Sequence, residues 1–183
     1  LVTSKQDKQA FLALDRSDRY AERLKIVPNG VDVDYFRPNG ALLRETEAIV
    51  LSGKMSYHAN ITMAMYLMEQ IMPIVWAQKP NTKVWIVGKD PSKEVRSFAS
   101  HPNVTVTGMV ADIRPYLQRA ALAVVPMVYG AGIQNKVLES MACGTPVVAT
   151  PKAIATIPAA LEKEVLVAEK ADEFAQKVVY LLE

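Results

Sequence analysis

The chain has 183 residues, of which 50% are hydrophobic and 22% are charged, and its formal net charge is +2. This length and apolar content fit one ordinary globular domain with a small appendage. The mixed charges disfavour a nucleic-acid surface, the single cysteine excludes an intramolecular disulfide, and two histidines with one cysteine offer no metal-ligand spacing.

The first 47 residues predict no sheet of their own. "VTSKQDKQAFLAL" predicts a strand end followed by a helix, and "LKIVPNGVD" predicts a strand that enters a turn at Pro28-Asn29-Gly30. Because the chain lacks an initiator Met and opens on the strand-like "LVTS", we expect a fragment of a longer protein. Residues 1–27 would then be the tail of a preceding domain and residues 28–47 a connector. The alternative is a small extension packed on the sheet that follows.

From residue 48 onward, short apolar runs alternate with helical segments. Strands are predicted at 48–53, 83–88, 104–108, 122–126, 146–150 and 164–168, and helices at 61–78, 113–120, 135–142 and 172–182. In the longest helix one face is expected to be buried, carrying Ile61, Met65, Met68, Met72 and Val75. Strands that are apolar on both faces predict an α/β domain with a doubly wound parallel sheet and helices on both faces. No apolar run reaches the roughly 18 residues of a membrane span.

In such a sheet, ligands bind beyond the carboxyl ends of the strands, where loops meet helix N-termini. The loop of Gly130, Ala131 and Gly132 follows one strand, and its glycines would let backbone amides approach a ligand closely. Lys136, in the first turn of the next helix, could add a cation beside a phosphate. Gly53 and Lys54 end the first strand of the domain and are placed to reach a diphosphate.

Glu139 is the single carboxylate of the helix predicted at 135–142, and it lies one turn beyond Asn135. A carboxylate only accepts hydrogen bonds, so Glu139 would suit the two hydroxyls of a ribose or another sugar diol. From the residues alone, the alternative is that Glu139 complements the helix dipole or pairs with Lys136. Neither GxxxxGK[ST] nor a GxGxxG after the first strand occurs, so both common nucleotide fingerprints fail.

Four segments together resemble a known family. "KIVPNGVDVDYF", the Gly-Lys after "AIVLS", "VTVTGMVADIRPYLQRAALAVVP" and "YGAGIQNKVLESMACGTPVVAT" resemble the C-terminal half of a GT-B glycosyltransferase, and more narrowly the group 1 retaining, nucleotide-sugar-dependent enzymes. "GKMSYHAN" and "GIQNKVLESMA" are further similar to bacterial sugar transferases associated with exopolysaccharide synthesis. The resemblance implies a Rossmann-like sheet that forms one half of a GT-B fold.

This resemblance also implies a division of labour. Residues 1–27 would be the tail of an N-terminal acceptor domain, residues 28–47 the interdomain connector, and residues 48–183 the nucleotide-sugar-binding domain. The implied partners are a nucleotide-sugar donor and a saccharide or lipid-linked acceptor, with no nucleic acid, no cofactor and no obligatory metal. The implied location is cytoplasmic, with peripheral association of the full-length protein at the inner membrane face as an option.

The family's site residues can be carried over position by position. Glu139 matches the second acid of the E-x7-E motif, which holds the ribose hydroxyls, and Lys54 matches the basic residue that contacts the diphosphate. Met109 and Val110 lie where the family cradles the base. The other implied donor-binding positions are Gly53, Gly130, Ala131, Gly132 and Asn135.

Two departures from the family pattern matter. The first acid of E-x7-E would fall at Ala131, so the carboxylate that usually contacts the donor sugar is lacking. The usual second lysine falls at Ala59, with Asn60 in place of its glycine. Our hypothesis is that Lys136 replaces this missing phosphate cation.

The resemblance implies that Lys54 and Lys136 stabilise a departing nucleoside diphosphate while an acceptor hydroxyl attacks with retention. By itself the fragment is expected to bind nucleotide weakly and to catalyse nothing. Two other functions stay open: a noncatalytic nucleotide-sugar-binding module, supported by Ala131, and a GT-B-like sugar-nucleotide epimerase.

Overall fold

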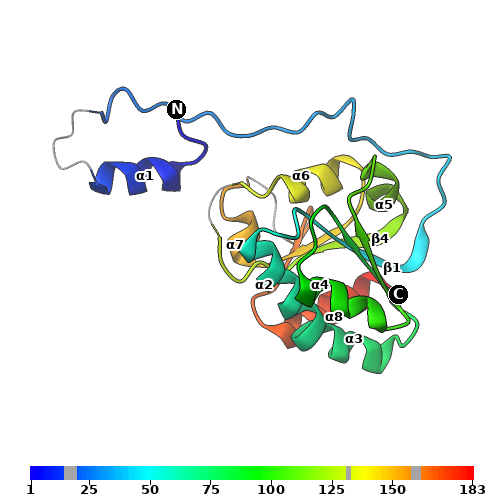
Figure 1. The fold of residues 1–183 in the computed structure, drawn as a ribbon. Coiled ribbons are helices and arrows are strands. Elements are labelled where there is room, and N and C mark those ends of the chain that lie inside the picture. The colour runs from blue at the N-terminus through cyan, green and yellow to red at the C-terminus, as the bar shows by residue number, and fades with distance from the viewer. Residues whose placement is uncertain (15–19, 131–132, 158–161) are drawn as a thin grey trace.

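The computed structural model describes residues 1–14, 20–130, 133–157 and 162–183 (Figure 1). Its centre is a six-stranded sheet with the strand order β3-β2-β1-β4-β5-β6, in which all neighbouring strands are parallel. The strands are β1 (Glu45–Ser52), β2 (Lys83–Val87), β3 (Val104–Gly108), β4 (Ala120–Val125), β5 (Val147–Ala149) and β6 (Leu166–Val167). Each of these strands overlaps one predicted from the sequence.

The strand order reverses between β1 and β4. The chain runs outward from β1 through β2 to β3, returns to β4 on the other side of β1, and continues outward to β6. This is the order of doubly wound nucleotide-binding sheets, in which loops diverge at the reversal and leave a crevice. The predicted Rossmann-like α/β architecture is therefore confirmed, and the loops after β1 and β4 are the ones that flank the crevice.

Helices cover both faces of the sheet (Figure 1). One face carries α2 (His58–Tyr66), a π-helical turn (Leu67–Ile71), α3 (Met72–Gln78), α4 (Lys93–Ser97), a 3₁₀ turn (Phe98–Ser100) and α8 (Ala171–Leu181). The other face carries α5 (Arg114–Arg119) and α6 (Asn135–Ala142), and the short α7 (Pro151–Ile154) follows β5. The bounds of α6 are those predicted from the sequence.

The predicted apolar face of the longest helix is partly wrong. Ile61 and Met65 are only half-buried, whereas the side chains that the core encloses include Met63, Leu67, Met68, Ile71, Met72 and Val75. The reason is the π turn between α2 and α3, which adds one residue to a helical turn and shifts the buried face by one position. A single helical period therefore describes only the second half of this segment.

The segment before the sheet holds α1 (Lys5–Leu14) and an isolated parallel bridge between Val2 and Ile26, which lies outside the six-stranded sheet. The strands expected around "LVTS" and "LKIV" thus contribute only this single bridge. Figure 1 shows the chain running from there in an extended course to β1.

The end of this extended course is fixed to the sheet domain by polar contacts. The Arg114 guanidinium lies 3.9 Å from the centre of the Tyr35 ring, and Gln118 Nε2 donates to the Arg37 carbonyl oxygen at 2.7 Å. Arg44 donates to the carbonyl oxygens of Ala120 at 2.8 Å and Gly144 at 2.6 Å. These contacts hold the connector against the α5 side of the domain.

Candidate functional site

Glycines allow the carboxyl ends of β1, β2 and β3 to meet closely. The Gly53 amide donates to the Val87 carbonyl oxygen at 3.0 Å, and the Gly88 amide donates to the Gly108 carbonyl oxygen at 3.2 Å. Gly88 has φ +153°, and a Cβ at this position would lie 1.7 Å from the Gly53 carbonyl oxygen. Only glycine fits such a contact, so Gly88 fixes the place where the loop after β1 begins.

A hydrogen-bonded cluster joins the loop after β1 to α6 across the reversal point. Lys136 Nζ donates to Asn60 Oδ1 at 2.6 Å, and Asn60 Nδ2 donates to the Lys54 carbonyl oxygen at 3.0 Å. The Asn60 side chain is buried at the start of α2. Gly53 closes the cluster, because a Cβ there would lie 2.8 Å from Asn60 Nδ2 and 3.3 Å from Lys136 Nζ.

Lys136 and Glu139 carry opposite charges and lie half-buried three positions apart on α6. Burial lowers the pKa of Lys136 from 10.5 to about 8, against the attraction of Glu139. Burial raises the pKa of Glu139, and Lys136 opposes that rise. Among the described residues no hydrogen bond or ion pair reaches the Glu139 carboxylate, so its oxygens are available to a ligand.

These side chains line one cavity of about 360 Å³ at the strand-order reversal. Its walls bring together five of the residues predicted from the sequence, Gly53, Lys54, Asn135, Lys136 and Glu139. Other lining residues are Ser52, Tyr57, Asn60, Ile113, Ile133 and Gln134. A cavity with two cations and an accepting carboxylate has the chemistry to hold an anion beside a diol.

The connector reaches the rim of this cavity, which the sequence did not indicate. Asn29 Nδ2 donates to Asn135 Oδ1 at 3.2 Å, although the two residues are 106 positions apart. The interaction places the Pro28-Asn29-Gly30 turn next to the first residue of α6. Paired asparagines this far apart leave no periodic signal in a single sequence.

Other predicted positions lie elsewhere. Met109 is 80% exposed and Val110 packs against the core, and neither lines the cavity that holds Lys136 and Glu139. Ile113, a few residues further on, does line it. Gly130 lines a different cavity, and Ala131 and Gly132 lie outside the described residues.

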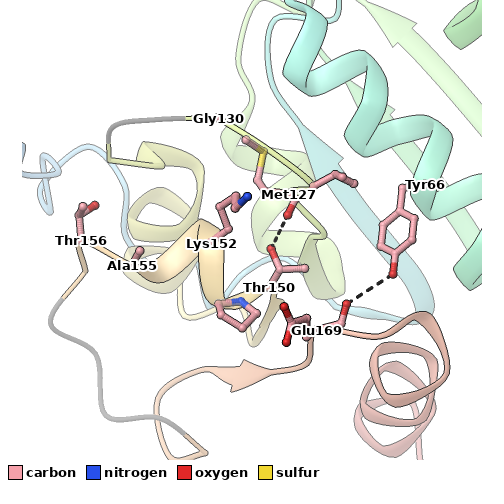
Figure 2. A pocket seen from close by; sticks show the side chains of 10 residues that line it. Tyr66, Met127, Gly130, Thr150, Lys152, Ala155, Thr156 and Glu169 are labelled. Carbon is pink, nitrogen blue, oxygen red and sulfur yellow. Dashed lines mark hydrogen bonds between the residues drawn. The ribbon is translucent and has the colours of Figure 1, made fainter. Parts of the chain in front are cut away.

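That second cavity, of about 640 Å³, opens beyond the ends of β4, β5 and β6 (Figure 2). Its charged lining residues are Lys152 and Glu169, and the Tyr66 hydroxyl lies 3.5 Å from the Glu169 carbonyl oxygen. At its floor, Thr150 Oγ1 donates to the Met127 carbonyl oxygen at 2.8 Å. The sequence reasoning missed these residues, since an isolated Lys and Glu carry no motif.

The described residues hold neither a cluster of metal-ligating side chains nor a helix fit to cross a membrane. No group of three or more His, Cys, Asp or Glu side chains in that part of the chain could hold a metal ion. In the same part of the chain, no helix is long and apolar enough to cross a membrane.

A parallel sheet whose strand order reverses, with a cavity lined by Lys54, Lys136 and Glu139 at the reversal, defines a Rossmann-like domain. Residues 46–183 match the family described as "Glycosyl transferases group 1", and the chain belongs to this family. A search of curated proteins finds no match to the chain.

Solved structures share the fold at low identity. TarM from S. aureus is 16% identical with a TM-score of 0.77, covering 99% of this chain and 36% of that one. Anabaena HepE, determined with UDP and glucose, is 15% identical with a TM-score of 0.73, covering 100% of this chain and 52% of that one. The C-terminal domain of the group 1 family protein LpcC from Francisella tularensis is 14% identical with a TM-score of 0.62, covering 84% and 88%.

The chain therefore spans about half or less of the length of TarM and HepE, and most of the LpcC domain. The expected resemblance to the C-terminal half of a GT-B glycosyltransferase is confirmed. The narrower similarity to exopolysaccharide-associated transferases stays a prediction.

Proposed function

We propose that this chain binds the nucleotide-sugar donor of a retaining glycosyltransferase, which transfers the sugar to an acceptor hydroxyl. The observation that carries the proposal is the cavity at the strand-order reversal, where Lys54 and Lys136 lie with Glu139, whose carboxylate has no hydrogen-bond or ion-pair partner among the described residues. The titles of two structural relatives support it, since HepE and TarM were each determined with UDP.

In the proposed complex each group of the cavity has one task. Lys54 and Lys136 bind the diphosphate, and the positive end of α6 adds to their field. Glu139 accepts hydrogen bonds from the two ribose hydroxyls. A bound diphosphate restores the full charge of Lys136, because a nearby anion favours the protonated amine.

The position of Lys136 supports its proposed substitution for the missing family lysine. That lysine would fall at Ala59, and Lys136 Nζ bonds to the very next residue, Asn60. The ammonium group thus comes from α6 rather than from α2, but it reaches the same end of β1. Two cations are thereby retained beside the proposed diphosphate.

The proposed reaction breaks the bond between the anomeric carbon and the diphosphate oxygen, which keeps the bonding electron pair. The acceptor oxygen forms the new bond on the same face of the sugar, and its proton passes to the departing diphosphate. Lys54 and Lys136 lower the barrier by neutralising the charge that develops on this leaving group. The mechanism needs no obligatory metal and no general base from this chain.

The remaining parts of the proposal concern the context. Residues 1–27 belong to the acceptor domain, residues 28–47 form the connector and residues 48–183 the donor domain. The acceptor is a saccharide or a lipid-linked saccharide in bacterial polysaccharide synthesis, at the cytoplasmic side of the membrane. The contact of Asn29 with Asn135 supports a connector that borders the donor site.

The test is a thermal-shift and calorimetry panel of UDP, GDP, ADP and their sugars on the chain. One nucleotide at 100 times its dissociation constant should stabilise the fold by about 2.7 kcal/mol. Glu139→Gln should weaken that binding, whereas Glu173→Gln, an exposed residue of α8, should not. Absence of binding by all three nucleotides would refute the proposal.

Product analysis with the full-length protein separates the alternatives. A new glycosidic bond supports the transferase. Donor binding without turnover supports the noncatalytic module, and an epimerised donor supports the epimerase.

A further inference from the structure

The side chain of Asn60 has only one orientation that satisfies both of its partners. The Lys136 ammonium can only donate and the Lys54 carbonyl oxygen can only accept, so Oδ1 must face Lys136 and Nδ2 must face Lys54. The two bonds are 2.6 Å and 3.0 Å long, and Asn60 as a residue is 7% exposed. Asn60 therefore forms a fixed bridge from the tip of Lys136 to the backbone of Lys54.

A carboxamide is a neutral partner for the ammonium group, and this matters for binding an anion. A carboxylate at position 60 would form an ion pair with Lys136 and cancel the charge that a diphosphate needs. It could also not donate to the Lys54 carbonyl oxygen, so the loop would lose its tether. The amide holds the cation in place and leaves its charge available.

Gly53 shows how closely this bridge is packed. A Cβ at Gly53 would collide with Asn60 Nδ2 at 2.8 Å and would crowd Lys136 Nζ at 3.3 Å. Gly53 and Lys54 belong to the β1 end, Asn60 to α2 and Lys136 to α6. Three separate elements thus meet at one neutral side chain, on the wall of the cavity that also contains Glu139.

We propose that Asn60 is a positioning residue that sets the Lys136 ammonium and the Lys54 backbone for the diphosphate of the donor. The inference rests on the proposed function and adds the requirement that residue 60 be a neutral hydrogen-bonding group. Its effect on the anion is exerted through the two lysines.

The test compares Asn60→Ala and Asn60→Asp with the wild-type chain, using UDP, GDP, ADP and inorganic pyrophosphate in calorimetry. Asn60→Ala should bind the preferred nucleotide about 10-fold more weakly, because the Lys136 ammonium loses the charge-assisted hydrogen bond that holds it in position. Asn60→Asp should bind it more weakly still. Asn103→Ala is the control, because Asn103 Nδ2 also donates to a backbone carbonyl, at 2.8 Å, but at the start of β3.

Thermal unfolding of the free variants separates positioning from mere structural support. The aspartate keeps a bond to Lys136, so Asn60→Asp should unfold at a higher temperature than Asn60→Ala while binding the nucleotide less well. A structural role predicts the same order for both measurements. In a Lys136→Met background, Asn60→Ala should lower affinity less than it does in the wild-type chain, because one of the two partners of Asn60 is already gone.

Each outcome decides a different point. If the wild-type chain binds the nucleotide and Asn60→Asp binds it with the same affinity, the role of Asn60 is overturned and the donor site stands. The same holds if the affinities of the variants follow the order of their unfolding temperatures. Failure of the wild-type chain to bind any of the nucleotides or pyrophosphate overturns the donor site and this inference together.

Discussion

Replacing Lys136 by Met should stabilise the free chain and weaken its binding of the donor. Methionine keeps the apolar stem and removes the ammonium group. The fall of the Lys136 pKa from 10.5 to about 8, at about 1.4 kcal/mol per pH unit, corresponds to about 3 kcal/mol of desolvation cost at neutral pH. Leaving Asn60 Oδ1 without its donor returns about 1–2 kcal/mol of this. The net gain in the free energy of unfolding is about 1–2 kcal/mol. For a chain of this size, each kcal/mol raises the melting temperature by about 2–4 °C.

The pH dependence of this difference has a definite sign. The pKa of Lys136 is lower in the folded than in the unfolded chain, so the unfolded chain binds more protons between pH 8 and 10.5. Stability therefore rises with pH in that window for the wild type but not for Lys136→Met. The advantage of the variant should be full below pH 8 and should shrink as the pH rises through that window. Near pH 10.5 it should reverse to a deficit of about 1–2 kcal/mol, because the contact with Asn60 is still lost.

The assays are urea unfolding at several pH values and calorimetry with the nucleoside diphosphate that the panel of UDP, GDP and ADP selects, for which UDP stands as the example. Loss of the charge-assisted phosphate contact, worth about 1.5–3 kcal/mol, should weaken UDP binding by about 10- to 150-fold. Lys93→Met, at an exposed lysine of α4, should change neither quantity. A variant that is less stable at every pH and binds UDP as the wild type does would refute the reasoning.

Three further predictions follow from the same contacts. Glu139→Gln should lower UDP affinity about 10-fold and should narrow the preference for UDP over 2′-deoxy-UDP, measured by calorimetry. Gly88→Ala should cost about 2–4 kcal/mol in urea unfolding because its Cβ would meet the Gly53 carbonyl oxygen, whereas Gly108→Ala should cost about 1 kcal/mol. Arg44→Ala should cost about 1–3 kcal/mol, because its guanidinium donates to two backbone carbonyl groups, and should leave UDP affinity unchanged.

Each of these has a contradicting result. An unaltered preference for the ribose 2′-hydroxyl in Glu139→Gln would remove the proposed ribose contact. Equal losses in the two glycine variants would show that strain at φ, and not the close contact, governs Gly88. Weaker UDP binding in Arg44→Ala would tie the connector to the site.

The sheet could be predicted from the sequence because most of its strands contain short apolar runs rich in Val and Ile, and most of these runs end at a Gly or Pro. The helix predicted at 135–142 matches α6 because Gly144 and Pro146 mark its end. The buried face of the longest helix could not be predicted in full, since nothing in "LMEQI" signals a π turn. The π turn that shifts it contacts α8, which lies more than 90 residues further along the chain.

Part of the site was predictable from the sequence. Lys54 directly follows the end of β1, Glu139 is the single carboxylate of the helix after β4, and their meeting follows from the strand order. The hydrogen bond from Lys136 to Asn60 joins residues 76 positions apart, and it depends on how α6 and α2 are placed relative to each other in the fold. The positions of Met109 and Val110 came from the resemblance, and the structure places both outside this cavity.

The anchored connector defines a pivot. From Tyr35 to Arg44 the chain is fastened to α5 and to the turn after α6, so this part must move with the sheet. Any domain that precedes it can swing only about the residues before Tyr35. The residues before Tyr35 include Asn29, which donates a hydrogen bond to Asn135 on the rim of the cavity. If such a domain closed over the cavity, its motion would be transmitted to the rim through the contact between Asn29 and Asn135. Domain closure and ligand binding would therefore be mechanically coupled.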